Sequence, residues 1–215
     1  MKRLIVVALA GLFTVLVLRC IARARTAHVM TFAGDSIILG IGSTSQANTV
    51  VGRLVNLKPH WYIRNYSVEG ASVSGGGGLS AMDPTAVVKL LGNSIVVFLG
   101  TNDWANGIAE STFKTNYSTF ITSLESLKAT IICVTPIWRV DEGKNNKAGY
   151  TIAELRSDIA SICTGRGHSV IDGLSLVPNT ASYYTPGGIH PNDDGYASYA
   201  TKLSSTLGGL IDQEK

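Results

Sequence analysis

The chain has 215 residues, of which 45% are hydrophobic and 15% charged, a composition that allows one compact domain and excludes wholesale disorder. The net charge of +3 arises in the first 24 residues, which hold four of the 18 basic residues and leave 14 basic against 15 acidic residues in the remaining chain. This balance gives no electrostatic case for a nucleic-acid-binding protein.

The first 24 residues have the pattern of a targeting segment. Lys2 and Arg3 precede an apolar run at residues 4–18, whose length suits a signal-peptide core and is short for a membrane span of about 20 residues. A small-x-small sequence at 22–24 offers a cleavage site, but the arginines after the apolar run hinder translocation, so an uncleaved anchor is the alternative. We expect residues 1–24 to be a signal peptide or an N-terminal membrane anchor, and the protein to be periplasmic, secreted or membrane-tethered.

From residue 28 onward, strand-like apolar runs alternate with helix-like segments. In chain order, the predicted elements are a strand at 28–33, a helix at 48–57, a strand at 62–68, a helix at 84–91, a strand at 94–99, a helix at 111–127, a strand at 130–135, a helix at 152–163, a strand at 168–172 and a helix at 192–207. The third strand is an unbroken apolar run, which is typical of a parallel sheet buried on both faces. This alternation predicts one doubly wound parallel α/β domain at residues 25–215.

Two cysteines lie in this domain. Cys133 falls in the fourth predicted strand and Cys163 in the fourth predicted helix. Two buried free thiols are the simpler interpretation, and a disulfide between them would need an oxidising compartment, so the sequence leaves their redox state open. No spacing of His, Cys, Asp or Glu residues indicates a metal site.

Four residues follow predicted strands, where active groups collect in a parallel α/β sheet. Ser36 comes after the first strand, Gly70 after the second, Asn102 after the third and His190 after the fifth. A serine hydroxyl, a histidine base and amide donors for an oxyanion are the components of a serine hydrolase. Each residue alone also has an ordinary structural interpretation as a turn, a turn glycine, a helix cap or a packed histidine.

The four sequence blocks that carry these residues, taken together and in this order, resemble the SGNH (GDSL) hydrolase family. The blocks are Gly34-Asp35-Ser36, Asn65-Tyr66-Ser67-Val68-Glu69-Gly70-Ala71-Ser72, Gly100-Thr101-Asn102-Asp103 and His190-Pro191-Asn192-Asp193-Asp194-Gly195-Tyr196. The resemblance covers residues 29–207 and implies a three-layer α/β/α, flavodoxin-like fold around a five-stranded parallel sheet. It also implies hydrolysis of esters or thioesters without a cofactor. The Gly-x-Ser-x-Gly elbow of the α/β-hydrolases is absent.

The resemblance assigns Ser36 as the nucleophile and His190 as the general base. The oxyanion would accept hydrogen bonds from the backbone N–H groups of Ser36 and Gly70 and from the side chain of Asn102. Trp104 follows this block and is a candidate for lining the acyl pocket. No large lid or long apolar insertion is visible, so we expect a carboxylesterase that cleaves short-chain acyl or acetyl esters of small molecules, polysaccharides or lipids through an acyl-enzyme.

One departure from the family pattern concerns the acid of the triad. The family usually carries an Asp three residues before the histidine, and this chain has Gly187 there. Such an Asp fixes the tautomer of the imidazole and stabilises the imidazolium. We hypothesise a Ser36–His190 dyad in which a backbone carbonyl of residues 185–188 accepts from the Nδ1–H of His190.

Several alternatives remain open. Asp172, at the end of the fifth strand, is a less favoured substitute for the missing acid, and Asp193 and Asp194 are expected to cap the last helix. The vacancy at Gly187 also allows a glycan- or cell-wall-binding protein with an inactive site. A lysophospholipase, a thioesterase or an acyltransferase of the same family is a further alternative.

Overall fold

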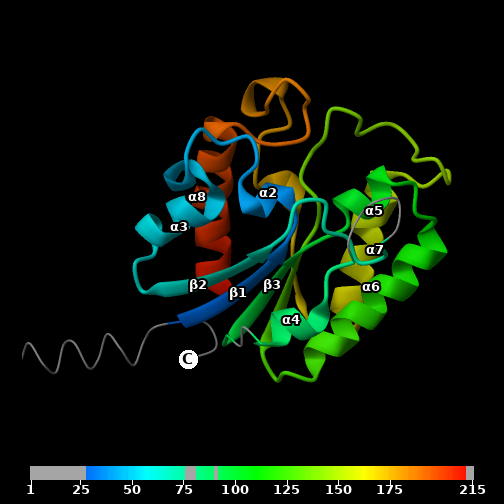
Figure 1. Cartoon of the computed structure of the whole chain (residues 1–215), viewed down its shortest axis with the longest axis horizontal. Coiled ribbons are helices and arrows are strands. Elements are labelled where there is room, and N and C mark those ends of the chain that lie inside the picture. The colour runs from blue at the N-terminus through cyan, green and yellow to red at the C-terminus, as the bar shows by residue number, and fades with distance from the viewer. Residues whose placement is uncertain (1–27, 76–80, 90–91, 212–215) are drawn as a thin grey trace, which may run out of the picture.

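The computed structural model describes residues 28–75, 81–89 and 92–211 (Figure 1). The leader predicted for residues 1–24 lies outside these ranges. Within them, no helix has the length and apolar character needed to cross a membrane.

The centre of the fold is a five-stranded, all-parallel sheet. Its strands are β1 (His28–Gly34), β2 (Trp61–Ser67), β3 (Ser94–Phe98), β4 (Thr130–Val134) and β5 (Ser169–Ile171). Their order is β2-β1-β3-β4-β5, which is the flavodoxin-like doubly wound topology. The predicted fold class is therefore confirmed, and each predicted strand lies within two residues of its observed bounds.

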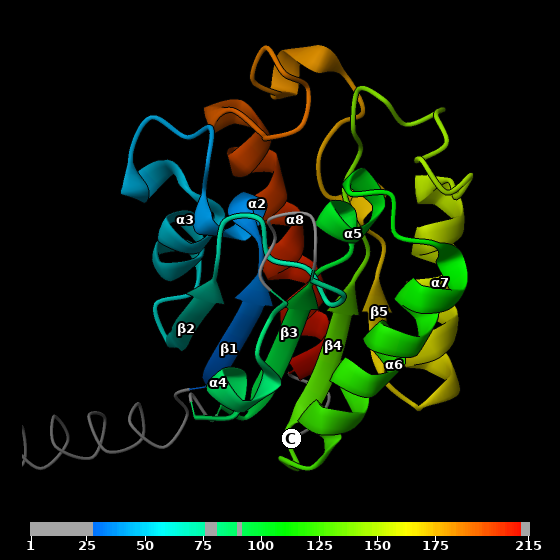
Figure 2. The ribbon, with the colours of Figure 1, turned by 45° about the vertical axis from the view of Figure 1, so that its right-hand side comes forward.

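Helices cover both faces of this sheet (Figure 2). In chain order they are α2 (Ser36–Leu39), α3 (Val50–Leu57), α4 (Pro84–Lys89), α5 (Thr101–Ala105), α6 (Glu110–Glu125), α7 (Ile152–Gly165) and α8 (Asp193–Ile211), with 3-10 turns η1 (Gln46–Asn48), η2 (Gly173–Ser175) and η3 (Ala181–Tyr183). One apolar core lies under α2, α3 and α8, and a second lies under α4 to α7. The molecule thus has three layers, as the sequence resemblance implied.

Alternation along the strands builds both cores. Met30 and Phe32 of β1 face the first core, whereas Ala33 faces the second, because successive side chains of a strand point to opposite faces. In β3, all five side chains are buried, which explains the unbroken apolar run seen in the sequence.

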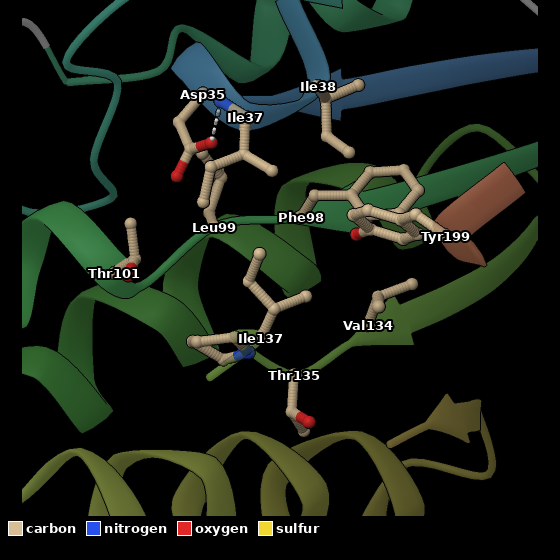
Figure 3. Close-up of a pocket in the computed structure, with 11 residues that line it drawn as sticks. Asp35, Ile37, Ile38, Phe98, Leu99, Thr101, Val134, Thr135, Ile137 and Tyr199 are labelled. Carbon is tan, nitrogen blue, oxygen red and sulfur yellow. Dashed lines mark hydrogen bonds between the residues drawn. The ribbon is translucent and has the colours of Figure 1, made fainter. Parts of the chain in front are cut away.

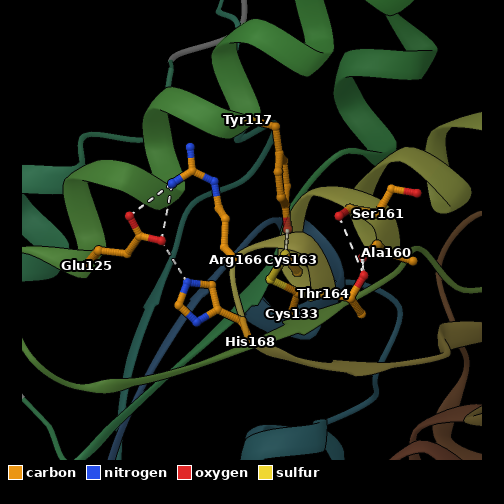
Figure 4. Close-up of a disulfide and its surroundings, with 9 residues drawn as sticks. All are labelled: Tyr117, Glu125, Cys133, Ala160, Ser161, Cys163, Thr164, Arg166 and His168. Atoms are coloured by element: carbon orange, nitrogen blue, oxygen red, sulfur yellow. Dashed lines mark hydrogen bonds and ion pairs between the residues drawn. A yellow bond between two sulfur atoms is a disulfide. The ribbon is translucent and has the colours of Figure 1, made fainter.

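A disulfide links the sheet to the second helical layer. Cys133 of β4 and Cys163 of α7 are both fully buried and are joined at 2.01 Å, beside Tyr117 of α6 (Figure 4). The simpler interpretation of the sequence, two free thiols, is therefore wrong. The pairing depends on the packing of α7 against β4, which brings the two Cα atoms to 6.6 Å across 30 residues of chain.

Candidate active site

Ser36 is the first residue of the short helix α2, directly beyond β1. Asp35 caps this helix, because its side chain accepts a hydrogen bond of 2.9 Å from the Ile37 N–H. Glycine at position 34 lets the end of β1 pass close to Ile38 of α2, since a Cβ at Gly34 would lie 2.8 Å from the Cβ of Ile38. The turn therefore presents the Ser36 hydroxyl at the carboxyl edge of the central strand, and the Ser36 N–H is the first amide of α2, without a partner inside the helix.

The Ser36 hydroxyl lies against the imidazole of His190. The distance between Oγ and Nε2 is 2.9 Å, although 154 residues of chain separate the two. His190 belongs to the segment of residues 184–190 that precedes α8, which we call the His segment. A bridge between Tyr184 and Pro191 closes it, and the Thr185 N–H donates to the His190 carbonyl at 2.9 Å.

Burial lowers the pKa of His190, and the positive charge of Arg139 lowers it further, while the carboxylate of Glu69 opposes both. A lowered pKa keeps the imidazole neutral to a lower pH than an ordinary histidine. In the neutral tautomer with a proton on Nδ1, Nε2 can accept the proton of the Ser36 hydroxyl. A neutral imidazole in this position is the form that a general base requires.

Gly70 and Asn102 lie on either side of Ser36. Gly34 pairs with Ser67 of β2 and with Phe98 of β3, so the three neighbouring strands end at the same level. Gly70, at φ 71°, occupies the turn that follows β2, and Asn102 lies in the first turn of α5 beyond β3. The Asn102 amide donates to the Ala71 carbonyl at 2.9 Å, which joins the two blocks.

The sequence places Asp103 in the same block as Asn102 but does not predict a role for it. It is fully buried, and its carboxylate accepts hydrogen bonds from the N–H groups of Val73 at 3.1 Å and Ser74 at 2.9 Å. Burial raises the pKa of Asp103. It ties the chain just after Gly70 to the helix that carries Asn102, and its place next to Asn102 was the signal in the sequence.

A small cavity lies between α2 and the ends of β3 and β4 (Figure 3). Its volume is about 20 Å³, room for about one water molecule, and its lining includes Asp35, Thr101 and Tyr199. Burial raises the pKa of Asp35 to about 7. The cavity is too small for an acyl chain.

Trp104 does not line this cavity. It is 4% exposed, its indole N–H donates to the Tyr150 carbonyl at 2.8 Å, and the Arg139 guanidinium lies 4.9 Å from its ring centre. Its contacts are those of a packed core residue. Arg139, which stacks on its ring, is also the cation whose charge acts on His190. That Trp104 lines an acyl pocket stays a prediction.

No carboxylate or carbonyl orients His190 within the part of the chain that the structure describes. The hydrogen bonds of His190 there are the Nε2 contact to Ser36 and the two bonds that its backbone carbonyl accepts from Thr185. The carbonyl of residues 185–188 that we expected to accept from Nδ1 makes no such bond, because this loop bonds the His190 backbone instead.

The neighbouring acids have other partners. Asp172 caps η2 through the Leu174 N–H. The side chain of Asn192, not that of Asp193 or Asp194, accepts from the first amides of α8. Asp193 instead bonds Thr44 and Asn48 on the loop before α3.

These features carry a family assignment. Residues 32–198 match the sequence model of the GDSL-like lipase/acylhydrolase family. The chain belongs to this family. Its blocks at Ser36, Gly70, Asn102 and His190 are the ones that pointed to it from sequence, and the Ser36–His190 contact joins the first and last of them.

Solved structures share the fold of this GDSL-like protein at low sequence identity. The psychrotrophic esterase EstA from Pseudoalteromonas sp., in a structure inhibited by monoethylphosphonate, is 13% identical with a TM-score of 0.70, over 86% of this chain and 99% of its own. The lipase/acylhydrolase from Enterococcus faecalis is 19% identical with a TM-score of 0.65, over 85% and 96%. A salicylyl-acyltransferase from a tetracycline biosynthetic pathway is 17% identical with a TM-score of 0.68, over 86% of this chain and 55% of its own. No curated protein matches the chain.

Proposed function

We propose that this GDSL-like protein is a serine carboxylesterase that uses a Ser36–His190 dyad on short-chain acyl or acetyl esters. The observation that carries the proposal is the 2.9 Å contact between the Ser36 hydroxyl and the His190 imidazole at the carboxyl edge of the sheet. Family membership supports ester chemistry, and the lowered pKa of His190, which follows from its burial, supports a base that is free at neutral pH.

The reaction would proceed through an acyl-enzyme. Ser36 Oγ attacks the ester carbonyl while its proton passes to Nε2 of His190, and the new oxyanion accepts hydrogen bonds from the Ser36 N–H, the Gly70 N–H and the Asn102 amide. When the C–O bond of the ester breaks, the leaving alcohol takes the proton from His190. Water then attacks the acyl group with His190 as base, which releases the acid and restores Ser36.

The substrate is a short acyl ester. The cavity beside Asp35 and Ile37 measures about 20 Å³, which leaves no room there for a long acyl chain. Small molecules, acetylated polysaccharides and lipid esters all present such groups. The outer face of the site would then meet the alcohol part of the substrate.

The protein acts outside the cytosol in this proposal. The basic start and apolar run of residues 2–18 support export or anchoring. The buried disulfide between Cys133 and Cys163 supports it independently, since disulfides persist in oxidising compartments.

The test is hydrolysis of chromogenic acetate, butyrate and octanoate esters by the purified full chain. We expect activity that falls with acyl length and that Ser36→Ala reduces by about 10⁴-fold or more. Ser161→Ala, an exposed serine on α7, is the matched control and should keep full activity. Equal rates in Ser36→Ala and wild type, or no hydrolysis by either, would refute the proposal, and the second result favours a binding protein. Product analysis with an added alcohol separates hydrolysis from acyl transfer.

A further inference from the structure

The His segment, residues 184–190, is held from outside by another loop. The chain between β4 and α7, residues 135–151, which we call the β4–α7 loop, runs beside it. The Val140 N–H donates to the Gly188 carbonyl at 2.9 Å. The rings of Trp138 and Tyr184 also pack against each other, with 5.0 Å between their centres. Both contacts join the two loops within six residues of His190.

The contact at Gly188 is close on both sides. Gly188 has φ 63°, and a Cβ there would lie 2.5 Å from the Cβ of Val140, so only glycine fits without movement. Gly187, by contrast, has open space, because nothing lies within 4 Å of a Cβ built on it. The β4–α7 loop therefore packs against Gly188. It leaves free space at Gly187, the position where the family usually has an Asp.

Buried arginines anchor the β4–α7 loop. Arg156 of α7 is 7% exposed and donates to the carbonyls of Pro136 at 2.7 Å and Ile137 at 2.9 Å, and it forms a two-point ion pair with Glu142. Arg139 is 4% exposed and pairs with Asp141 at 2.8 Å. Buried, bidentate arginine pairs fix geometry more firmly than surface pairs do. The residues on both sides of Val140 are thus held in place.

The opposite side of His190 is also packed. A Cβ added at Gly42 would lie 3.2 Å from the Cβ of His190 and 2.5 Å from the Pro191 carbonyl oxygen. The loop after α2 therefore touches His190 from the side of Ser36, and the β4–α7 loop touches its segment from the other side. The backbone around His190 therefore packs between two loops, although no acceptor among the described residues bonds its Nδ1.

We propose that the β4–α7 loop is the positioning element that takes over the orienting task of the missing acid at Gly187. The Val140–Gly188 hydrogen bond and the Trp138–Tyr184 ring contact hold the His segment so that Nε2 stays within reach of Ser36. The inference rests on the proposed function for its catalytic consequence. Val140 and Trp138 are positioning residues, since they act through His190 and touch no reacting atom.

The experiment disrupts the Val140–Gly188 hydrogen bond by a change at Val140 or at Gly188. It then asks whether a carboxylate added at position 187 compensates for the loss. Val140→Pro deletes the donor, and Val140→Ala keeps it as the matched control. Gly188→Ala pushes the loops apart, and Gly187→Ala, which has free space, is its control. Each variant is made with and without Gly187→Asp where the position allows, and kcat, KM and melting temperature are measured for the full chain.

We expect Val140→Pro and Gly188→Ala to lower kcat by about 10- to 100-fold at nearly constant KM, because misplacing a catalytic group by about 1 Å has this effect. The Ala controls should stay within about twofold. In the Gly187→Asp background the loss from Val140→Pro should shrink to about threefold or less, because the carboxylate then orients the imidazole. An equal loss in both backgrounds would overturn the proposal, as would unchanged kcat in a folded Val140→Pro protein.

Two further measurements separate the competing explanations. Glu69 is the carboxylate whose charge raises the pKa of His190, so Glu69→Gln should leave kcat within about twofold if the loop, and not this charge, orients the ring. NMR of the His190 imidazole should show one sharp ring signal in Val140→Ala and a broadened or divided signal in Val140→Pro. This signal tests the loop even if the protein hydrolyses no ester, a result that would refute only the proposed function. A sharp His190 signal in Val140→Pro would overturn the inference.

Discussion

Asp35 is the residue whose burial is hardest to reconcile with its charge. Asp35 is 2% exposed, one of its carboxyl oxygens accepts from the Ile37 N–H, and the positive charge of Arg139 acts on it. Desolvation outweighs these contacts and raises its pKa to about 7 from an ordinary value of 3.8. The residue beside Ser36 therefore binds a proton more tightly in the folded protein than in the unfolded chain.

We expect Asp35→Asn to change how stability depends on pH. The proton on Asp35 stabilises the folded state below about pH 4, and this contribution, up to about 4 kcal/mol, is lost as the pH rises towards 7. Asn does not titrate and keeps an oxygen that can cap α2. In urea unfolding from pH 4 to pH 8, the free energy of unfolding of Asp35→Asn should therefore rise relative to wild type. A difference that stays constant over this range would show that Asp35 has an ordinary pKa.

Single residues differed in how well the sequence predicted them. The meeting of Ser36 with His190 followed from the sequence pattern, because Ser36 lies just beyond β1 and His190 just before α8, at the same edge of the sheet. The group that orients His190 was not predictable, because hydrogen bonds of a loop depend on its neighbours in space, and the neighbour here is the β4–α7 loop. Trp104 resembles a pocket residue in sequence, but only the structure reveals that Arg139 and Tyr150 cover it.

At the scale of elements, the turn after β2 and the helix α5 form one unit. The Asn102 amide donates to the Ala71 carbonyl. The Asp103 carboxylate accepts hydrogen bonds from the N–H groups of Val73 and Ser74, which follow in the same turn. Two adjacent side chains of α5 therefore hold the backbone that presents the Gly70 N–H. The Gly70 N–H and the Asn102 amide, which we propose as oxyanion donors, are therefore joined in one unit.

Loss of this unit should reduce catalysis more than substrate binding. We expect Asp103→Ala to lower kcat by about 10- to 100-fold with a smaller change in KM, because oxyanion donors act mainly in the transition state. It should also lower the free energy of unfolding by about 1–3 kcal/mol, since two amides lose their acceptor. Asp103→Asn keeps one acceptor oxygen and should lose less of both. Kinetics and urea unfolding of the two variants check this, and a KM effect that exceeds the kcat effect would contradict it.

All five strands and the helices α3, α4, α6, α7 and α8 were predictable, whereas the short helices α2 and α5 were not. The strands and the helices α6, α7 and α8 follow from apolar periodicity over many residues, and Thr151 and Glu154 form the capping box that starts α7. The helices α2 and α5 contain four and five residues, too few for a periodic pattern. Each begins within three residues of the end of a buried strand, and of the two only α2 has a side-chain cap, from Asp35.

At the scale of the whole molecule, the topology explains why distant residues meet. The order β2-β1-β3 sets Ser36 between Gly70 and Asn102, and α8 returns across the first face of the sheet so that His190, at its start, reaches the same edge. Tyr196 of α8 reinforces this return, because its hydroxyl lies 2.9 Å and 2.8 Å from the carbonyl oxygens of Ile37 and Ile41. The fold class was predictable from the alternation of strands and helices, whereas the disulfide was not, because sequence spacing does not reveal which buried elements touch.

Covalent labelling of Ser36 tests the central claim most directly. A p-nitrophenyl alkylphosphonate would form an Oγ–P bond at an activated serine and release p-nitrophenolate, and intact mass with peptide mapping then locates the adduct. We predict a single adduct on Ser36, none in Ser36→Ala, and labelling slowed by about 10²- to 10⁴-fold in a folded His190→Ala variant. An adduct on another residue, or equal labelling rates with and without the His190 imidazole, would contradict the account.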